Sequence, residues 1–204
     1  MADYYLNGEE KFGPVMSRLY AAGSKAGPAK KIYGFLIDDI TSAGAARILD
    51  VGTGNGTVPI RLARASKRSV VYAVDPSRDM IGIARRDSAG IGNIRFALGS
   101  SRHVPFRAKF EIIFSCLSFH HWQRKEESLR YLASRLAKGG EIRIYEYNKG
   151  KAGFLKNTLM YGHLLSLPEM RAVVKASGLR ISGILEKGAL VRVSIRRGLS
   201  RIPS

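Results

Sequence analysis

The chain has 204 residues, which is the size of one compact domain. Its 34 lysine and arginine residues against 16 aspartate and glutamate residues give a formal net charge of +18, so any polyanion is attracted without sequence preference. No apolar run approaches the ~20 residues of a membrane span, the acidic start lacks a secretory pattern, and the single cysteine, Cys116, excludes an internal disulfide or a cysteine-based metal site. We therefore expect a cytoplasmic protein.

Along the first half of the chain, the hydrophobic period alternates between helical and strand-like, as it does in α/β proteins. A helix is expected over residues 28–40 and a buried strand over residues 47–51. The strand runs into a glycine-rich turn, after which Thr57 is the expected N-cap of a helix. A second strand is expected over residues 70–74, then a helix capped by Ser77 that reaches toward residue 89, then a third strand over residues 94–98.

The second half continues this alternation. A fourth strand is expected over residues 110–117, then a helix over residues 123–137 that Gly139-Gly140 terminates, and a fifth strand over residues 141–147. Helices around residues 154–166 and over residues 169–176 precede two closing strands near residues 179–185 and 189–195. In the last strand, apolar residues alternate with polar ones, which predicts one buried face and one cationic face: Val191, Val193 and Ile195 against Arg192, Ser194 and Arg196.

The order of these elements predicts a doubly wound α/β fold, with a mostly parallel, seven-stranded, Rossmann-like sheet and an antiparallel carboxy-terminal strand. We expect one domain over residues 1–204. It is divided into an amino-terminal helical cap segment at 1–44, a ligand-binding core at 45–148, a helical insertion at 149–167 and a carboxy-terminal helix with a strand pair at 168–204. Ligands of such sheets bind beyond the carboxyl ends of the strands, where the strand order changes.

The strongest indication of function is the turn after the first strand, Gly52-Thr53-Gly54-Asn55-Gly56. Glycines at alternate positions allow a tight turn and a close approach of the backbone to a ligand. A dinucleotide fingerprint would have its third glycine at the position of Thr57, so a nicotinamide cofactor is disfavoured but left open. Asp75 closes the second strand, where a carboxylate accepts hydrogen bonds from both hydroxyls of a ribose. Turn and acid together predict an adenosine-type ligand.

Between residues 45 and 183 the chain resembles the class I S-adenosylmethionine-dependent methyltransferases, in particular a type 11-like subgroup whose members act on many small acceptors. The similar segments follow the family's order: residues 49–56, Asp75, and residues 98–106, 110–122 and 136–140. The resemblance implies S-adenosylmethionine as cofactor. The chain departs from the family at Ser100, where an aspartate is usual beside the adenine, and at Lys138-Gly139-Gly140, which lacks the usual proline.

Carried onto these positions, the resemblance implies that Asp50 and the turn backbone face the methionine end of the cofactor, while Asp75 holds the ribose. Pro76 and Ser77 would flank the adenine, Ser100 and the backbone of Ser101 would bound it, and Ser115 or Cys116 would line the sulfonium. The full set of expected cofactor-binding residues is Asp50, Gly52, Thr53, Gly54, Asn55, Gly56, Asp75, Pro76, Ser77, Gly99, Ser100, Ser101, Ser115 and Cys116.

Methyl transfer from a sulfonium is an in-line displacement, so positioning and exclusion of water supply most of the rate. An acceptor that must lose a proton needs a base, and His120 and His121, after the fourth strand, are the candidates. Their alternative role is packing beside Trp122. Glu146, at the end of the fifth strand, is a further candidate base or a salt-bridge partner. The other histidines lack partners at metal-ligand spacing, so no metal is expected.

Selection of the acceptor is predicted to lie in the amino-terminal segment, with Tyr4, Tyr5, Phe12 and Tyr20, and in residues 149–167. These parts form either a lid or only a cover for the sheet edge. An Asn-Pro-Pro-aromatic motif, which holds amino nitrogens in related families, is absent.

Three hypotheses are left: a methyltransferase for a small molecule, which is favoured; one for RNA or another polyanion; and a non-catalytic S-adenosylmethionine-binding sensor or partner subunit. The oligomeric state is open.

Overall fold

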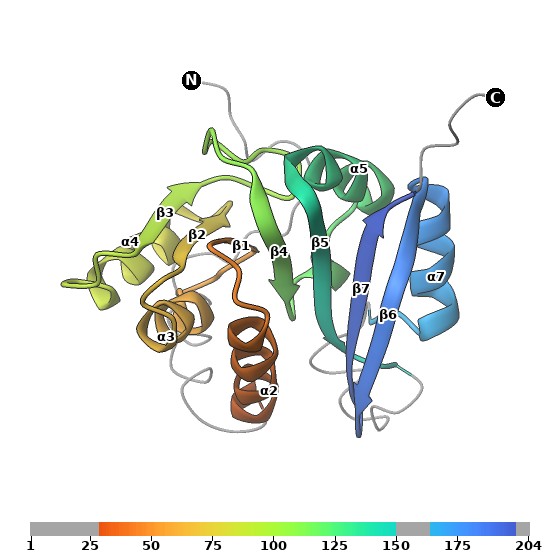
Figure 1. Ribbon diagram of the computed structural model, residues 1–204, viewed down its shortest axis with the longest axis horizontal. Coiled ribbons are helices and arrows are strands. Elements are labelled where there is room, and N and C mark those ends of the chain that lie inside the picture. Colours follow the sequence, from red (N-terminus) through yellow and green to blue (C-terminus); the bar gives the residue numbers. More distant parts are fainter. Residues whose placement is uncertain (1–28, 150–163, 199–204) are drawn as a thin grey trace.

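The computed structural model of this chain describes residues 29–149 and 164–198 (Figure 1). Within these ranges seven strands form one sheet in the order β3-β2-β1-β4-β5-β7-β6. Strand β7 pairs antiparallel with both β5 and β6, and the other pairs are parallel. The predicted fold class, a mostly parallel seven-stranded sheet with an antiparallel carboxy-terminal strand, is confirmed.

The strands and helices lie close to their predicted positions. The strands are β1 (Arg47–Val51), β2 (Val70–Asp75), β3 (Ile94–Leu98), β4 (Phe110–Cys116), β5 (Leu136–Tyr147), β6 (Leu179–Lys187) and β7 (Leu190–Arg197). The helices are α2 (Ala29–Ser42), α3 (Thr57–Ala65), α4 (Arg78–Asp87), the short 3-10 helix η1 (Phe119–His121), α5 (Lys125–Arg135) and α7 (Leu167–Ala176). The predicted amino-terminal aromatic segment and nearly all of the predicted helix around 154–166 fall outside the described residues.

Helices flank both faces of the sheet (Figure 1). Helices α2 and α3 pack on one face, where Leu36 and Phe114 belong to one buried cluster. Helices α5 and α7 pack on the other face, where Leu129 and Ile113 belong to a second cluster. Successive residues of β4, Ile113 and Phe114, thus face opposite layers, as the pleat of a strand requires. In the described ranges, no helix is both long enough and apolar enough to cross a membrane.

The start of α3 differs from the prediction. Its N-cap is Gly56, with a φ of 78°, and no side chain caps the helix, so the expected N-cap role of Thr57 is wrong. Instead, the Asn55 side-chain oxygen accepts hydrogen bonds from the Thr57 hydroxyl at 2.9 Å and from the Thr57 N–H at 3.3 Å. At α4 the prediction is confirmed, because the Ser77 hydroxyl accepts from the Met80 N–H at 3.3 Å.

The expected helix stop at Gly139-Gly140 is also wrong, because α5 ends at Arg135 and both glycines lie within β5. The β4–β5 register shifts between Phe110 and Ile112. A Cβ on Gly140 would lie only 2.8 Å from the carbonyl oxygen of Phe110. Glycine is therefore needed here for a close approach of two strands, which is a known role of glycine in a strand.

Candidate active site

The strand order reverses between β1 and β4, and the glycine turn follows the carboxyl end of β1. The N–H groups of Gly52 and Thr53 both donate to the carbonyl oxygen of Val74, at 2.9 and 3.0 Å. The N–H of Gly54 donates to Asp75 Oδ2 at 2.7 Å. The structure therefore brings together the turn and the acid that the sequence indicated, at the place where open α/β sheets bind ligands.

Two glycines of the turn are required by contacts within the chain. Gly52 has a φ of 78°, and a Cβ there would lie 1.9 Å from Ser118 Oγ. Gly56 also has a φ of 78°, and its Cβ would lie 2.8 Å from the Cβ of Ala84. An L side chain rarely adopts this conformation even where space is open. From the sequence, the glycines were expected only because a ligand approaches the backbone closely. In the structure, neighbouring side chains of the protein also leave no room for a Cβ at these two positions.

Asp75 links three segments at the end of β2. Its Oδ2 accepts from the Gly54 N–H and its Oδ1 from the Ser77 N–H, at 2.7 and 2.9 Å. A carboxylate oxygen has about two lone pairs and can accept more than one hydrogen bond. The side chain is 8% exposed, so its position is fixed by the protein. Asp75 is thus a pre-oriented acceptor between the glycine turn and α4.

Asp50 lies one residue before the carboxyl end of β1 and is 2% exposed. Burial raises the pKa of Asp50 to about 7; a 2.7 Å hydrogen bond from the Thr53 hydroxyl opposes this shift, and the charge of Asp75 adds to it. A ligand cation placed between the two carboxylates would favour the ionised form of both. The site is therefore suited to a ligand that carries positive charge.

The segment after β3 is closely folded. A Cβ on Gly99 would lie 2.6 Å from the carbonyl oxygen of His103. The Ser100 N–H donates to that oxygen at 2.8 Å, and the Ser100 hydroxyl accepts from the Arg102 N–H at 3.2 Å. The Ser101 hydroxyl lies 2.8 Å from that of Ser128 on α5. Ser101 can therefore offer a ligand its backbone rather than its side chain.

At the end of β4, Ser115 is buried, and its hydroxyl has no hydrogen-bond partner among the described residues. Burial raises the pKa of the Cys116 thiol well above its usual value, and the charges of Asp50 and Glu146 raise it further. The thiol is therefore neutral, so Cys116 is unsuited to act as a nucleophile. Leu117 then takes a left-handed conformation, with a φ of 51°, and its N–H donates to the Tyr145 carbonyl oxygen at 3.0 Å.

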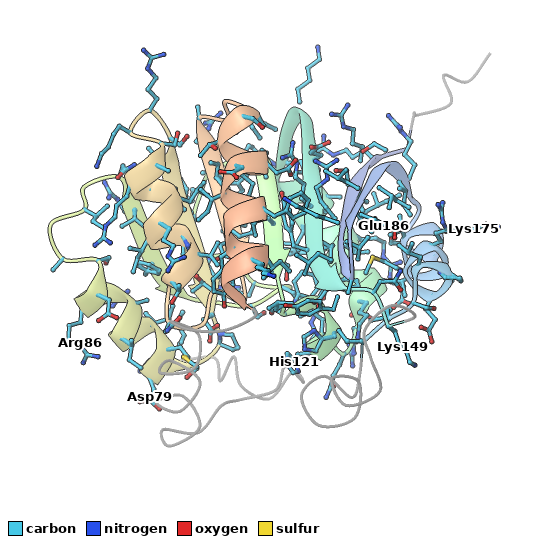
Figure 2. The ribbon with its side chains drawn as sticks, turned by 90° about the horizontal axis from the view of Figure 1, so that it is seen from below. Asp79, Arg86, His121, Lys149, Lys175 and Glu186 are labelled. Carbon is cyan, nitrogen blue, oxygen red and sulfur yellow. The ribbon has the colours of Figure 1, made fainter. Side chains whose placement is uncertain are left out.

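His120 and Glu146, two separate candidates in the sequence, contact each other. His120 Nδ1 lies 3.0 Å from both carboxylate oxygens of Glu146, and the two side chains are 1% and 3% exposed. The ring of His121 lies beside that of His120, with centroids 4.0 Å apart. Figure 2 shows His121 near the lower edge of the described part of the chain. A carboxylate on Nδ1 favours the tautomer that leaves Nε2 as the proton acceptor.

Ser118 is a site residue that the sequence did not indicate. Its hydroxyl fills the space beside Gly52 and accepts a hydrogen bond from Trp122 Nε1 at 3.3 Å. The loop that carries His120 is thereby packed against the glycine turn. A serine between apolar residues is common, so the sequence gives no indication that Ser118 contacts the glycine turn. Among the residues described, no group of three or more histidine, cysteine, aspartate or glutamate side chains is placed to hold a metal ion.

Residues 48–140 match the model of a family described as a methyltransferase domain. The ubiquinone/menaquinone biosynthesis C-methyltransferase UbiE of Wigglesworthia glossinidia brevipalpis is 26% identical over 136 residues, which are 64% of this chain and 54% of that protein. An uncharacterized methyltransferase of Staphylococcus carnosus is 28% identical over 130 residues, 61% of this chain and 60% of that protein. The chain thus spans little more than half the length of these curated relatives.

Solved structures share the fold. A SAM-dependent methyltransferase from Aquifex aeolicus superposes with a TM-score of 0.72 and 20% identity, covering 91% of this chain and 98% of that one. An O-methyltransferase from neocarzinostatin biosynthesis, in complex with S-adenosyl-L-homocysteine and 1,4-dihydroxy-2-naphthoic acid, superposes with a TM-score of 0.66 and 21% identity, over 76% of this chain and 50% of that one.

Proposed function

We propose that this chain is a class I S-adenosylmethionine-dependent methyltransferase, because residues 48–140 match a methyltransferase-domain family, and that it transfers a methyl group from S-adenosylmethionine to a small-molecule acceptor. The observation that carries the proposal is the 2.7 Å hydrogen bond from the Gly54 N–H to Asp75, which joins the glycine turn to the acid at the change in strand order. The acceptor atom, oxygen, carbon or nitrogen, is left open, and the type 11-like subgroup and the cytoplasmic location stay predictions.

The residues present fit the cofactor. Asp75 offers a carboxylate at the end of β2, the position suited to a ribose diol, and Asp50 adds a second carboxylate beside the turn. The sulfonium and the amino group of S-adenosylmethionine are cationic, so two adjacent buried acids complement them. Ser100 and the backbone of Ser101 would bound the adenine without a charged acceptor. When bound, the cofactor supplies a methyl group on a good leaving group.

His120 is the side chain that we assign to removal of the acceptor proton. Glu146 binds its Nδ1, so Nε2 is the nitrogen that takes the proton, and the carboxylate stabilises the imidazolium that results. Glu146 acts through His120 and is a positioning residue. We prefer His120 to His121 as the base because the contact with Glu146 is made by the ring of His120. Two relatives are named as a C-methyltransferase and an O-methyltransferase, and base assistance is compatible with either type of acceptor.

The test is transfer of a labelled methyl group from S-adenosylmethionine to fractionated small molecules, RNA and protein. We expect label in the small-molecule fraction. The variants His120→Gln and Glu146→Gln should lower kcat by about 10²- to 10⁴-fold, the usual contribution of a general base, without changing cofactor affinity. His121→Gln is the matched control and should keep most of the activity.

Other outcomes would contradict the proposal and identify its rivals. Label in RNA alone would favour the polyanion-modifying enzyme. Cofactor binding without transfer to any fraction would favour the sensor or partner subunit. Loss of activity in His121→Gln but not in His120→Gln would overturn the assignment of the base.

A further inference from the structure

The edge of the sheet opposite the active site carries an excess of positive charge. Several exposed cations of the described chain lie at or just before the amino-terminal ends of parallel strands. Five of them have neither a side-chain hydrogen bond nor an ion pair to another described residue, and we name this group the amino-terminal rim: Lys67, Arg68, Arg107, Lys138 and Arg180. They precede or begin β2, β4, β5 and β6. Apart from the neighbours Lys67 and Arg68, these residues are far apart in the sequence, and the strand order gathers them along one edge.

The acids near the rim are already neutralised. Glu111 pairs with Arg47 at 3.0 Å, and Glu141 binds two arginines, Arg143 at 2.7 Å and Arg196 at 3.0 Å. In contrast, the five rim cations have no ion-pair partner among residues 29–149 and 164–198. The rim therefore keeps its full positive charge.

One pair at the rim is unfavourable for the sheet itself. Arg180 of β6 lies directly opposite Arg196 of β7 in the antiparallel register. Like charges in directly opposite positions destabilise a strand pair. Glu141 neutralises Arg196, but Arg180 has no acid within the described residues. A bound anion at this point would relieve the repulsion, which is an indication of a ligand independent of the charge count.

We propose that the amino-terminal rim binds the phosphate backbone of single-stranded nucleic acid without sequence preference. From β2 to β6 the rim extends roughly 24 Å, since neighbouring strands lie about 4.8 Å apart, and this length accommodates several consecutive phosphates. A membrane surface is disfavoured as the partner, because binding to it needs exposed apolar side chains that insert between the lipids. Among the described residues the exposed large apolar side chain is Leu185 of β6, which is not part of the rim.

The rim is distinct from the proposed methyl-transfer site. The seven residues of β4 separate the two edges by about 20 Å at a rise of ~3.3 Å per residue. Phosphates bound at the rim are therefore not positioned as methyl acceptors. The rim is a tethering surface, and the proposal holds whether or not the acceptor of the enzyme is a small molecule.

The experiment measures binding of a labelled uridine homopolymer of about 20 nucleotides to the full chain by fluorescence anisotropy, between about 50 and 200 mM salt. The variant Arg107→Gln/Lys138→Gln removes two rim charges. The control Arg171→Gln/Lys187→Gln removes two exposed charges from α7 and from the carboxyl end of β6. We expect the rim variant to reduce the slope of log affinity against log salt by about 1.4, or about 0.7 per contact, and the control to leave it unchanged.

An equal loss in both double variants would overturn the proposal, because binding would then follow net charge and not the rim. Absence of RNA binding, with binding to phosphatidylserine vesicles that the rim variant abolishes, would overturn it in favour of a membrane surface. Cofactor binding in the rim variant, measured on the same sample, should equal that of the unmodified chain. Failure of the proposed nucleic-acid binding is thereby distinguishable from failure of the proposed methyltransferase function.

Discussion

Gly52 is the residue at which the fit between the glycine turn and the loop after β4 is most easily tested. In Gly52→Ala the new Cβ would lie 1.9 Å from Ser118 Oγ and 2.7 Å from Ser118 Cβ, so rotating the hydroxyl does not relieve the clash. Gly44→Ala is the matched control, because Gly44 has a similar φ of 64° and nothing within 4 Å. We expect Gly52→Ala to lower the free energy of unfolding by about 1–3 kcal/mol more than Gly44→Ala, as is typical of overpacking. Equal losses in urea denaturation would contradict the contact.

Asp50 gives a prediction about pH. Its pKa is about 7 in the folded protein against an ordinary value of 3.8, so between these values the folded state binds a proton that the unfolded chain releases. The free energy of unfolding should therefore fall as the pH rises through this window, with a slope of up to about 1.4 kcal/mol per pH unit from this group. Asp50→Asn is neutral throughout and should lack this contribution. Urea denaturation at about pH 5 and 8 measures it, and a difference between the two proteins that is the same at both pH values would contradict it.

The proximity of Asp75 to the glycine turn could be predicted from the sequence, because a carboxylate at the end of the next strand has a recognisable position. Its role in binding the cofactor stays a prediction. Leu117 and Ser118 could not be predicted. Leucine has no preference for the left-handed conformation that Leu117 adopts, and nothing in the sequence around Ser118 indicates that it contacts Gly52. The contact between His120 and Glu146 was also invisible, since it depends on the pairing of β4 with β5.

At the scale of elements, Asp39 joins helix α2 to the sheet. Its carboxylate accepts from Tyr145 on β5 at 2.6 Å, from Arg143 on β5 at 2.9 Å and from Arg192 on β7 at 2.6 Å. Burial alone would raise the pKa of Asp39, but the hydrogen bonds from Arg192 and Tyr145 and the nearby guanidinium charges hold it below its usual value. The predicted cationic face of the last strand is thus partly covered by α2 and ion-paired.

Asp39→Ala should lower the free energy of unfolding by about 3 kcal/mol, because it leaves the mostly buried guanidinium groups of Arg143 and Arg192 without this acid. Asp38→Ala removes the exposed neighbouring acid and should change stability by less than about 0.5 kcal/mol. Chemical denaturation of both variants measures the difference. A similar small change in each would show that α2 is held by its apolar face alone.

The elements themselves were largely predictable, because parallel strands covered on both faces are apolar runs and the helices between them show a clear period. The errors concern glycine and threonine at element ends. Gly139-Gly140 is a typical helix stop in the sequence, but Gly140 permits the close approach of β4 and β5, and only the register distinguishes these roles. Thr57 reads as an N-cap, but Asn55 binds its hydroxyl.

At the scale of the whole molecule, the fold places acidic and basic side chains at opposite edges of the sheet. The acids Asp50, Asp75 and Glu146 gather at the carboxyl edge of the sheet, and the amino-terminal rim lies at the other edge. The sequence revealed the net charge of +18 but not this division, because the cations are scattered along the chain and are brought together only by the strand order.

Calorimetric titration with S-adenosylhomocysteine tests the central claim most directly. The unmodified chain should bind, and Asp75→Ala should weaken binding at least tenfold, or about 1.4 kcal/mol. Asp79→Ala, in the first turn of α4 and labelled in Figure 2, is the matched control and should bind normally. An unmodified chain that does not bind, or a folded Asp75→Ala variant with unchanged affinity, would contradict the account.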